Sequence, residues 1–450
     1  MWSVLAGSRQ GLLLFAILTG TFLVPVNSTM IAVGLPSIAD SLQSDLIHAS
    51  WVVTIYLIVM TTFQPIAGKL GDLYGNRQTF LLGLLLFLIA SLGCIAADGL
   101  LGLSVFRALQ ALGGALASPN ASAILRFAIP KEQMGRTFGL FGLSMGLGAA
   151  IDPLIGSFLI SAWGWTSIFW INIPFASLSF VLSFLVLPKR ESRPASAVDV
   201  PGSILLAIGL VTLILLSTHA EYANVWTSGL LLLVILLFVL QERRCKVPLI
   251  QFELFRIRMF TSANLSILLA NAIMYSTILV MPILLQRDLH LPIETIGWLL
   301  FAFSLCMSLC SWVGGYLSDR IGRDKTVLFS FLISGLAAAA YLGIYPYHSV
   351  SYLCLVFIIG GIGSGIGTAA MQTASLQAVA KELAGIASGI FLTFRYIGGM
   401  IASVLVSLLV DYRLLFYMLI GFAILGIPVS LGLLDPTGRQ VRREGQDIGG

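Results

Sequence analysis

One octapeptide occurs twice in this chain, each time at the end of a long apolar run. Gly68–Gly75, GKLGDLYG, returns 247 residues later as Gly315–Gly322, GYLSDRIG. Trp51 and Trp298 have the same offset, so the copy extends over the apolar run that precedes each octapeptide. A repeat of this length predicts a fold made of two similar halves.

The composition predicts that both halves lie in a membrane. Hydrophobic residues make up 58% of the chain and charged residues 10%, whereas soluble domains contain about 25% charged residues. A run of about 20 apolar residues spans the hydrocarbon core of a bilayer, which is about 30 Å thick. The sequence contains fourteen such runs and therefore predicts an all-α membrane protein with fourteen transmembrane helices. The runs are 11–38, 47–68, 78–97, 99–123, 137–160, 165–187, 200–220, 224–241, 260–286, 294–317, 325–346, 350–378, 384–410 and 412–434.

The positive charges predict the orientation, because short loops rich in Lys and Arg stay in the cytoplasm. In a fourteen-span arrangement, 21 of the 25 lysines and arginines fall on one side of the membrane. Only Arg287 and Arg413 fall on the other side, and Arg107 and Arg395 lie within spans. This distribution predicts a multi-pass protein of the cell membrane with both termini in the cytoplasm. The net charge of +5 follows from the same asymmetry and does not indicate nucleic-acid binding.

Two hydrophilic connections, at 188–199 and 241–258, divide the chain into three parts. We expect a six-helix bundle at 1–187, a linker with two inserted helices at 188–241, and a second six-helix bundle with a cytoplasmic tail at 242–450. The repeat supports this division, since the duplicated segments are spans 1–2 and 9–10 and spans 7–8 have no partner.

Four motifs then identify a family. They follow one another along nearly the whole chain: Gly68, Leu70, Asp72 and Gly75 after span 2; Arg107, Gln110 and Gly113 in span 4; Trp165–Pro174 at span 6; and Pro248–Ile250 with Leu254–Arg256 after span 8. In this order and spacing they resemble the motifs of the major facilitator superfamily, and specifically of its fourteen-helix drug:proton antiporter branch.

The resemblance implies a fold and an activity. Two six-helix bundles rock around a midplane cavity and open it to each side in turn. The expected function is proton-coupled efflux of amphipathic cationic or zwitterionic compounds, driven by the proton gradient without a cofactor. The expected partners are therefore small amphipathic substrates, protons and the lipid bilayer, with no nucleic acid, and the expected protein is a monomer.

Two departures from the branch pattern bear on the mechanism. Exporters of this branch commonly carry an acid in span 1, where this chain has Asn27. The antiporter signature in span 5 usually contains Gly-Pro, where this chain has Asp152-Pro153. At a rise of about 1.5 Å per residue, Asn27, Arg107 and Asp152 all lie near the midplane.

A carboxylate at that depth costs several kcal/mol unless it is paired, hydrated or protonated. We therefore expect Asp152 to carry the proton, with Arg107 as its partner. The alternative is a permanent Asp152–Arg107 pair that holds spans 4 and 5 together. Arg107 has no arginine counterpart in the second half, where Cys354 stands at the 247-residue offset.

The remaining candidates fall into three groups. Glu221 and Asp411, at outer helix ends, are further proton-coupling candidates. Candidate substrate contacts are Asn27, Phe22, Trp51, Tyr56, Gln110, Trp298, Arg395 and Tyr396, although lipid-facing or packing roles are open for each aromatic residue and a structural role is open for Arg395. Candidate gating residues are Gly68, Asp72, Gly75, Arg77, Gly315, Asp319, Arg320, Gly322 and Pro153; we expect Asp72 and Asp319 to interact with a helix N-terminus or a nearby Arg.

Other functions are less well supported by the sequence. The Gly-rich run from Gly360 to Gly367 lies inside a span, where close helix packing explains it better than nucleotide binding. Walker, zinc-protease and serine-hydrolase motifs are absent from the sequence, so we expect no enzyme activity. The alternatives that stay open are export of an endogenous amphiphile, such as a lipid intermediate or siderophore, then nutrient uptake, and a non-transporting membrane receptor or scaffold.

Overall fold

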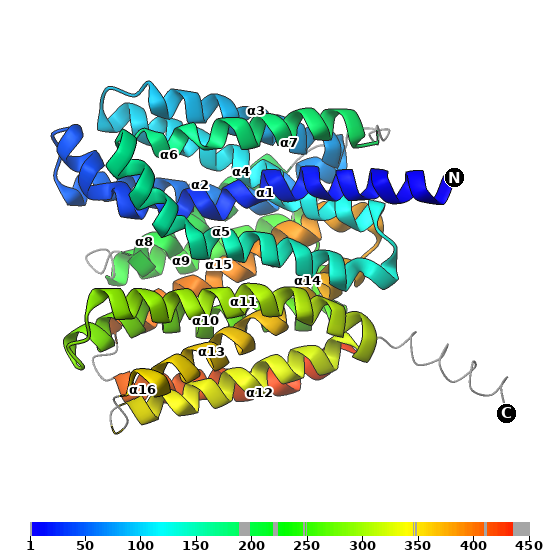
Figure 1. Ribbon diagram of the computed structural model, residues 1–450. Helices are drawn as coiled ribbons and strands as arrows, with labels where there is room; N and C mark the ends of the chain where they lie inside the picture. Colours follow the sequence, from blue (N-terminus) through cyan, green and yellow to red (C-terminus); the bar gives the residue numbers. More distant parts are fainter. Residues whose placement is uncertain are drawn as a thin grey trace, which may run out of the picture.

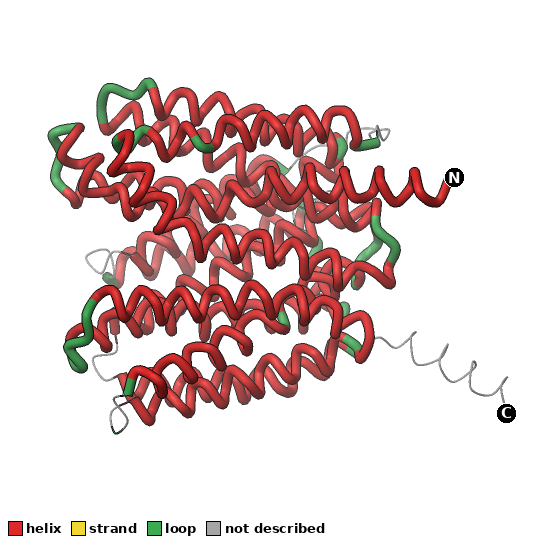
Figure 2. The backbone as a smooth tube through the Cα atoms, in the orientation of Figure 1, coloured by secondary structure: helices red, strands yellow, loops and turns green. Residues whose placement is uncertain are grey.

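The computed structural model describes a bundle of long helices (Figures 1 and 2). It describes residues 2–188, 199–218, 224–245, 248, 250–344, 346, 349–408 and 412–434. For some helical residues, among them Asp152 and Pro153, only the backbone is described. Every regular element in the described part is a helix, as the apolar runs predict.

The helices follow the predicted order. Those of the first half are α1 (Trp2–Ser41), α2 (Leu46–Tyr74), α3 (Asn76–Ile95), α4 (Leu100–Ala128), the short η1 (Lys131–Gln133), α5 (Met134–Trp163), α6 (Ser167–Trp170) and α7 (Asn172–Val186). The inserted pair is α8 (Val200–Thr218) and α9 (Val225–Arg244). Those of the second half are η3 (Phe252–Arg256), α10 (Arg258–Arg287), α11 (Ile293–Ile321), α12 (Arg323–Tyr341), η4 (Leu342–Ile344), α13 (Val350–Ile366), α14 (Thr368–Gln377), η5 (Lys381–Leu383), α15 (Ala384–Leu408), α16 (Tyr412–Ser430) and η6 (Leu431–Leu433).

The repeated octapeptides form the turns after α2 and α11. The last residue of each, Gly75 and Gly322, has φ of 105° and 103°. A side chain with a Cβ is strained in this region, so glycine allows the chain to reverse within one residue. We call the end of the molecule that carries these two turns the aspartate end, because Asp72 and Asp319 lie there.

The two halves pack against each other through two helix pairs. α5 lies beside α11, and α2 lies beside α15. In Figure 1, α1–α7 occupy the upper part of the molecule and α10–α16 the lower part. The inserted helix α8 contacts both α2 and α15, so the pair α8 and α9 lies along the seam between the halves.

The helices α2–α5 correspond to α11–α15 with one change of register. α2 begins at Leu46 and α11 at Ile293, an offset of 247, whereas α4 begins at Leu100 and α13 at Val350, an offset of 250. The second half therefore contains three additional residues in the connection before α13. This register decides which residues of α4 and α13 are equivalent.

The number, length and apolar character of the helices indicate an integral membrane protein. Among the described residues, eleven helical segments are long and apolar enough to cross a membrane, and shorter apolar segments lie at 10–24 and 200–216. Tight packing between the halves depends on small residues, because little hydrophobic driving force acts between helices in lipid. The fourteen-span count stays a prediction at this stage.

Candidate functional site: a buried arginine network and reciprocal aspartate contacts

Arg107 of α4 lies at the centre of the first half and is fully buried, with 0% exposure. Its Nη2 donates to the backbone carbonyl of Asn27 at 3.2 Å, and its Nε donates to that of Val52 at 3.4 Å. Its Nη1 donates to Oε1 of Gln110, one helical turn further along α4, at 2.5 Å. The guanidinium also lies over the ring of Tyr56, 4.2 Å from its centroid. Arg107 therefore joins α1, α2 and α4.

Asn27 continues this network into α7. Its Nδ2 donates to Oδ1 of Asn172 at 2.6 Å, and Nδ2 of Asn172 donates back to Oδ1 of Asn27 at 2.9 Å. The amide of Gln110 donates to Oδ1 of Asn27 at 3.3 Å and to Oγ of Ser91 at 2.8 Å. These four side chains are at most 1% exposed. Amides from α1, α4 and α7 thus satisfy one another in the interior, as buried polar groups require.

The network compensates the charge of Arg107 by dipoles. Among the described side chains, no carboxylate pairs with Arg107, and its acceptors are carbonyl oxygens and an amide oxygen. A buried cation is costly unless hydrogen bonds or a counter-charge compensate it. Carbonyl dipoles and the face of Tyr56 supply that compensation here. The site is therefore positively charged as the described residues form it.

The second half has no copy of this centre. Because α4 and α13 correspond at an offset of 250, the counterpart of Arg107 is Phe357, which corrects the expected pairing with Cys354. The counterpart of Tyr56 at the 247-residue offset is Phe303, and both phenylalanines are at most 1% exposed. Their rings pack edge to face with centroids 6.4 Å apart. An apolar pair thus occupies the place that the charged pair holds in the first half.

At the aspartate end, each half caps a helix of the other half. The carboxylate of Asp72 accepts hydrogen bonds from the backbone amides of Gly385 and Ile386, both at 2.8 Å, in the first turn of α15. The carboxylate of Asp319 accepts from those of Gly135 at 2.9 Å and Arg136 at 2.8 Å, in the first turn of α5. A helix N-terminus presents free N–H groups and a positive dipole, so a carboxylate is its natural partner.

Glycines allow the halves to approach closely at these contacts. A Cβ on Gly68 would overlap the backbone carbonyl of Gly385, and a Cβ on Gly315 would overlap that of Gly135. Further along α15, a Cβ on Gly389 would lie 2.6 Å from the carbonyl oxygen of Gln64. The two contacts α2–α15 and α5–α11 are therefore backbone-to-backbone contacts that any larger residue would push apart.

Two asparagines extend the Asp72 contact into the first half. The amide of Asn76 donates to Oδ1 of Asp72 at 3.4 Å and to Oδ1 of Asn120 at 3.0 Å. Asn120, in α4, is fully buried and donates to the carbonyls of Ala67 and Leu116. Asn76, Asn120 and Asn172 were not among the site residues predicted from the sequence. The feature that could have identified them is an amide side chain within or beside an apolar span, where polar side chains are rare.

Additional contacts close the aspartate end between α4 and α14. The buried Arg126 donates through Nε to the carbonyl of Leu376 at 3.1 Å. Nε2 of Gln372 donates to Oγ of Ser122 at 3.2 Å. Nε2 of Gln377 donates to the carbonyl of Lys131 at 3.1 Å. The halves are therefore joined at this end by side chains as well as by glycines.

Comparison with known proteins assigns the family. Residues 17–242 and 263–448 match the family model described as Major Facilitator Superfamily. This chain belongs to the major facilitator superfamily. It is 44% identical over 438 residues to the uncharacterized MFS-type transporter YvkA of Bacillus subtilis, a match that covers 97% of this chain and 99% of that protein.

More distant relatives in the superfamily carry substrate names. The chain is 27% identical over 403 residues to the multidrug transporter protein MdtP of Bacillus subtilis, covering 87% of this chain and 74% of that protein. It is 29% identical over 392 residues to the riboflavin transporter RibZ of Clostridioides difficile, covering 86% and 85%. Among solved structures, the human organic anion transporter MFSD10 has the same fold, with a TM-score of 0.70, 14% identity, and coverage of 94% and 99%.

The other predicted residues of this superfamily member lie in several places. Tyr396 packs with Tyr56 in one apolar cluster, and Phe22 lies 6.2 Å from Phe175, measured between ring centroids. Trp51 and Arg395 are partly buried, whereas Trp298 is 68% exposed and lies on the surface of α11. The structure thus brings Tyr56, Gln110, Asn27 and Tyr396 to one region and leaves Trp298 outside it.

The arginine gating candidates at the turns, Arg77 and Arg320, make contacts within their own halves. Nη2 of Arg77 donates to the carbonyl of Phe184 at 2.7 Å, and its guanidinium lies over the Phe184 ring. The guanidinium of Arg320 lies 4.4 Å from the centroid of the Tyr316 ring. Glu221 and Asp411 lie outside the described residues. Asp152 and Pro153 lie within α5, and their side chains are outside the described part.

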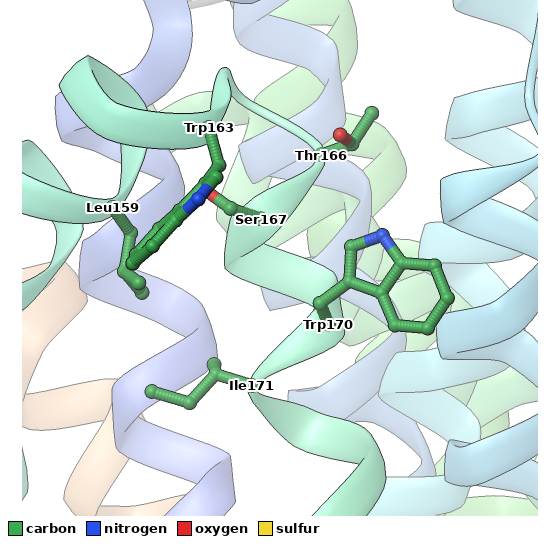
Figure 3. A pocket seen from close by; sticks show the side chains of 6 residues that line it. All are labelled: Leu159, Trp163, Thr166, Ser167, Trp170 and Ile171. Atoms are coloured by element: carbon green, nitrogen blue, oxygen red, sulfur yellow. The ribbon is translucent and has the colours of Figure 1, made fainter.

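A pocket of about 460 Å³ opens at the end of the molecule opposite the aspartate end (Figure 3). Its lining comes from the last turns of α5, from α6 and from the residues beside it: Leu159, Trp163, Thr166, Ser167, Trp170 and Ile171. Trp163 and Trp170 are 67% and 56% exposed, and tryptophans in such positions are typical of the membrane–water boundary. The lining shares no residue with the arginine network, so we assign it no part in the site.

Proposed function

We propose that this superfamily member is a proton-coupled exporter of amphipathic cationic or zwitterionic compounds that works by alternating access. The observation that carries the proposal is Arg107, a cation held in the interior of one half by carbonyls and amides while the second half has an apolar pair at the same place. A fold that only scaffolds other proteins has no need of a buried charge at this depth.

The aspartate contacts support alternating access. With Asp72 and Asp319 each bound to the opposite half, the aspartate end is closed. The positive-inside rule places this end in the cytoplasm, so the conformation is the one closed to the cytoplasm. Transport to the outside requires the reverse movement, in which these contacts break and the bundles 1–187 and 242–450 rock about the seam.

We assign fourteen spans to the membrane. Eleven are the long apolar segments, and the other three are α1, α5 and α8, whose lengths are 40, 30 and 19 residues. A span needs about 20 residues. The inserted pair α8 and α9 then crosses the membrane as a hairpin beside α2 and α15.

The proton carrier in this proposal is Asp152. The arginine network contains amides, a hydroxyl and a phenol but no described carboxylate, so a titrating acid has to come from elsewhere. Asp152 lies eleven residues before the end of α5, which places it about 16 Å from that end. Protonation of Asp152 from outside neutralises its carboxylate and releases substrate, and deprotonation toward the cytoplasm restores affinity. Each proton that crosses 100 mV supplies roughly 2.3 kcal/mol.

Asp152→Asn tests this assignment in proteoliposomes with an imposed pH gradient. We expect gradient-driven export to be abolished while substrate binding is retained. Asp98→Asn, which changes an exposed aspartate between α3 and α4, is the matched control and retains export. Asn27→Asp combined with Asp152→Gly returns an acid to the same layer and partly restores coupling. Undiminished export by Asp152→Asn contradicts the assignment and moves the role to Glu221 or Asp411.

A further inference from the structure

Arg395 is a second cation deep in the membrane, on α15 of the other half. It lies near the middle of the span Lys381–Val406. Its side chain is only partly buried, and among the described residues no carboxylate or carbonyl accepts a hydrogen bond from it. An arginine at this depth is costly without a counter-charge. Arg395 therefore differs from Arg107, which is fully buried and hydrogen-bonded.

The described carboxylates of the spans are too far along their helices to serve Arg395. Each lies within three residues of the end of its span: Asp72, Glu242, Glu294, Asp319, Asp324 and Glu382. Asp72 and Asp319 are also bound to helix N-termini. Asp152 lies on α5, which packs mainly on α11 and α1. Among the described side chains, none therefore supplies a carboxylate to Arg395 in the middle of the membrane.

Neighbouring residues place Arg395 on a face of α15 that packs against protein. Residues four and seven positions apart share a helical face, so Arg395 shares a face with Gly399 and Ser388. A Cβ on Gly399 would lie 3.2 Å from the Tyr275 ring of α10, and Ser388 is 1% exposed. This face therefore looks toward protein. The next residue, Tyr396, packs into the first-half cluster that contains Tyr56.

We propose that Arg395 binds a carboxylate of the transported compound, so that the preferred substrates are amphipathic zwitterions that carry a carboxylate. This inference rests on the proposed export function and narrows its substrate class. A guanidinium forms two parallel hydrogen bonds to a carboxylate. Tyr396, which has both Arg395 and Tyr275 as neighbours, supplies with Tyr275 aromatic faces for the apolar part of the compound.

The same geometry selects against simple cations. Arg107 and Arg395 give both halves a positive charge in the membrane interior, and the described side chains of the spans place no negative charge between them. While Asp152 is protonated, a compound with a cationic group and no carboxylate meets repulsion without compensation. Repulsion of the wrong ligand is as effective a source of specificity as attraction of the right one.

Two fluorescent dyes that differ by one methyl group test the inference. Rhodamine 110 carries a free carboxylate, and rhodamine 123 is its methyl ester. Equilibrium binding to the purified full-length protein, followed by fluorescence anisotropy without any gradient, gives the ratio of the two dissociation constants. We expect the carboxylate dye to bind about ten-fold more tightly, which is the contribution of one charged hydrogen-bonded contact.

Three variants then locate the preference. Arg395→Gln abolishes the preference, because it weakens the binding of the carboxylate dye alone. Arg395→Lys retains part of the preference because the charge remains. Arg287→Gln, at the exposed end of α10, leaves the ratio unchanged. The unmodified protein carries the main test, so the result does not depend on whether Arg395→Gln folds.

Two outcomes overturn the inference. One is an unmodified protein that binds both dyes equally or prefers the ester. The other is an Arg395→Gln protein that binds both dyes with the same ratio as the unmodified protein, which is the behaviour of a purely structural arginine. The binding ratio is independent of proton coupling. A protein that shows the ratio but moves neither dye against a pH gradient contradicts the proposed function alone.

Discussion

The guanidinium of Arg107 lies 4.2 Å from the centroid of the Tyr56 ring, and this pair has no charged counterpart in the repeat. Phe357 and Phe303 hold the equivalent positions and pack edge to face. The two halves thus share a backbone plan and differ in the chemistry of this buried pair. The charged centre at this position belongs to the first half.

This asymmetry predicts different effects for equivalent substitutions. Arg107→Gln removes the guanidinium hydrogen bonds to the carbonyls of Asn27 and Val52, and we expect gradient-driven transport to fall by more than about ten-fold, equivalent to about 1.4 kcal/mol. Phe357→Leu is expected to lower stability by about 1–2 kcal/mol and to leave transport within about two-fold. Thermal unfolding and transport in proteoliposomes, measured for both variants, check the prediction. Equal loss of transport in the two variants would show that the asymmetry has no functional role.

The aspartate contacts predict slower transport when their charge is removed. Asp72→Asn replaces one of the two accepting carboxylate oxygens by an amide NH2, so one charge-assisted hydrogen bond becomes a neutral one, weaker by about 1 kcal/mol, and the other is lost. We expect transport to slow several-fold while substrate affinity changes little, because the contact biases conformation and does not touch the ligand. Asp319→Asn is expected to be milder, since Arg320 and Arg323 remain close in sequence. Loss of binding with normal transport kinetics in Asp72→Asn is the contrary result.

The close contacts at the glycines predict that adding one methyl group at such a position pushes the two halves apart. In Gly68→Ala the new Cβ overlaps the backbone carbonyl of Gly385. We expect the closed aspartate end to become less populated, because backbone cannot yield as a flexible side chain does. The reporter is cross-linking of Ser122→Cys to Gln372→Cys by a short bifunctional maleimide, in a background without the five native cysteines. Gly421→Ala, whose Cβ meets no atom within 4 Å, is the control, and equal cross-linking in both variants refutes the prediction.

The orientation is testable with a cysteine that the chain already carries. Cys245 directly follows α9 and is partly exposed. In a variant that keeps Cys245 alone, we expect a membrane-impermeant maleimide to label inside-out vesicles and not intact cells. Fusions of a reporter in 188–199 are expected to report the cytoplasm as well. Labelling of Cys245 in intact cells would reverse the orientation derived from the positive charges.

The sequence predicts the helix order and the repeat because both depend on local patterns. Apolar runs about 20 residues long mark the spans, and Gly75 and Gly322 mark turns that require positive φ. The depth of a residue in the membrane, calculated from the rise per residue of a helix, also placed Asn27 and Arg107 in one layer. In the structure, Arg107 donates a hydrogen bond to the carbonyl of Asn27. These inferences need only the geometry of a single helix.

The sequence was not sufficient to predict the contacts between helices. Asn172 pairs with Asn27 across 145 residues, and nothing along the chain links the two amides. The offset of 247 assigned Cys354 as the counterpart of Arg107, because the three added residues before α13 lie in a connection where the repeat is not visible. Trp298 shares an offset with Trp51 yet is far more exposed, so a repeated residue need not keep its surroundings.

The contact between Arg126 and Leu376 joins two positions that are copies of each other, and so does the contact between Ser122 and Gln372. Both pairs are separated by 250 residues, the offset of α4 and α13, so a pseudo-two-fold axis passes between the members of each pair. In a symmetric dimer of one half, each such residue would meet its own twin. An arginine there would face an arginine. Two copies joined in one chain need not be identical at the axis. The second copy therefore offers Arg126 the backbone carbonyl of an uncharged leucine, where a homodimer would place a like charge beside the same carbonyl.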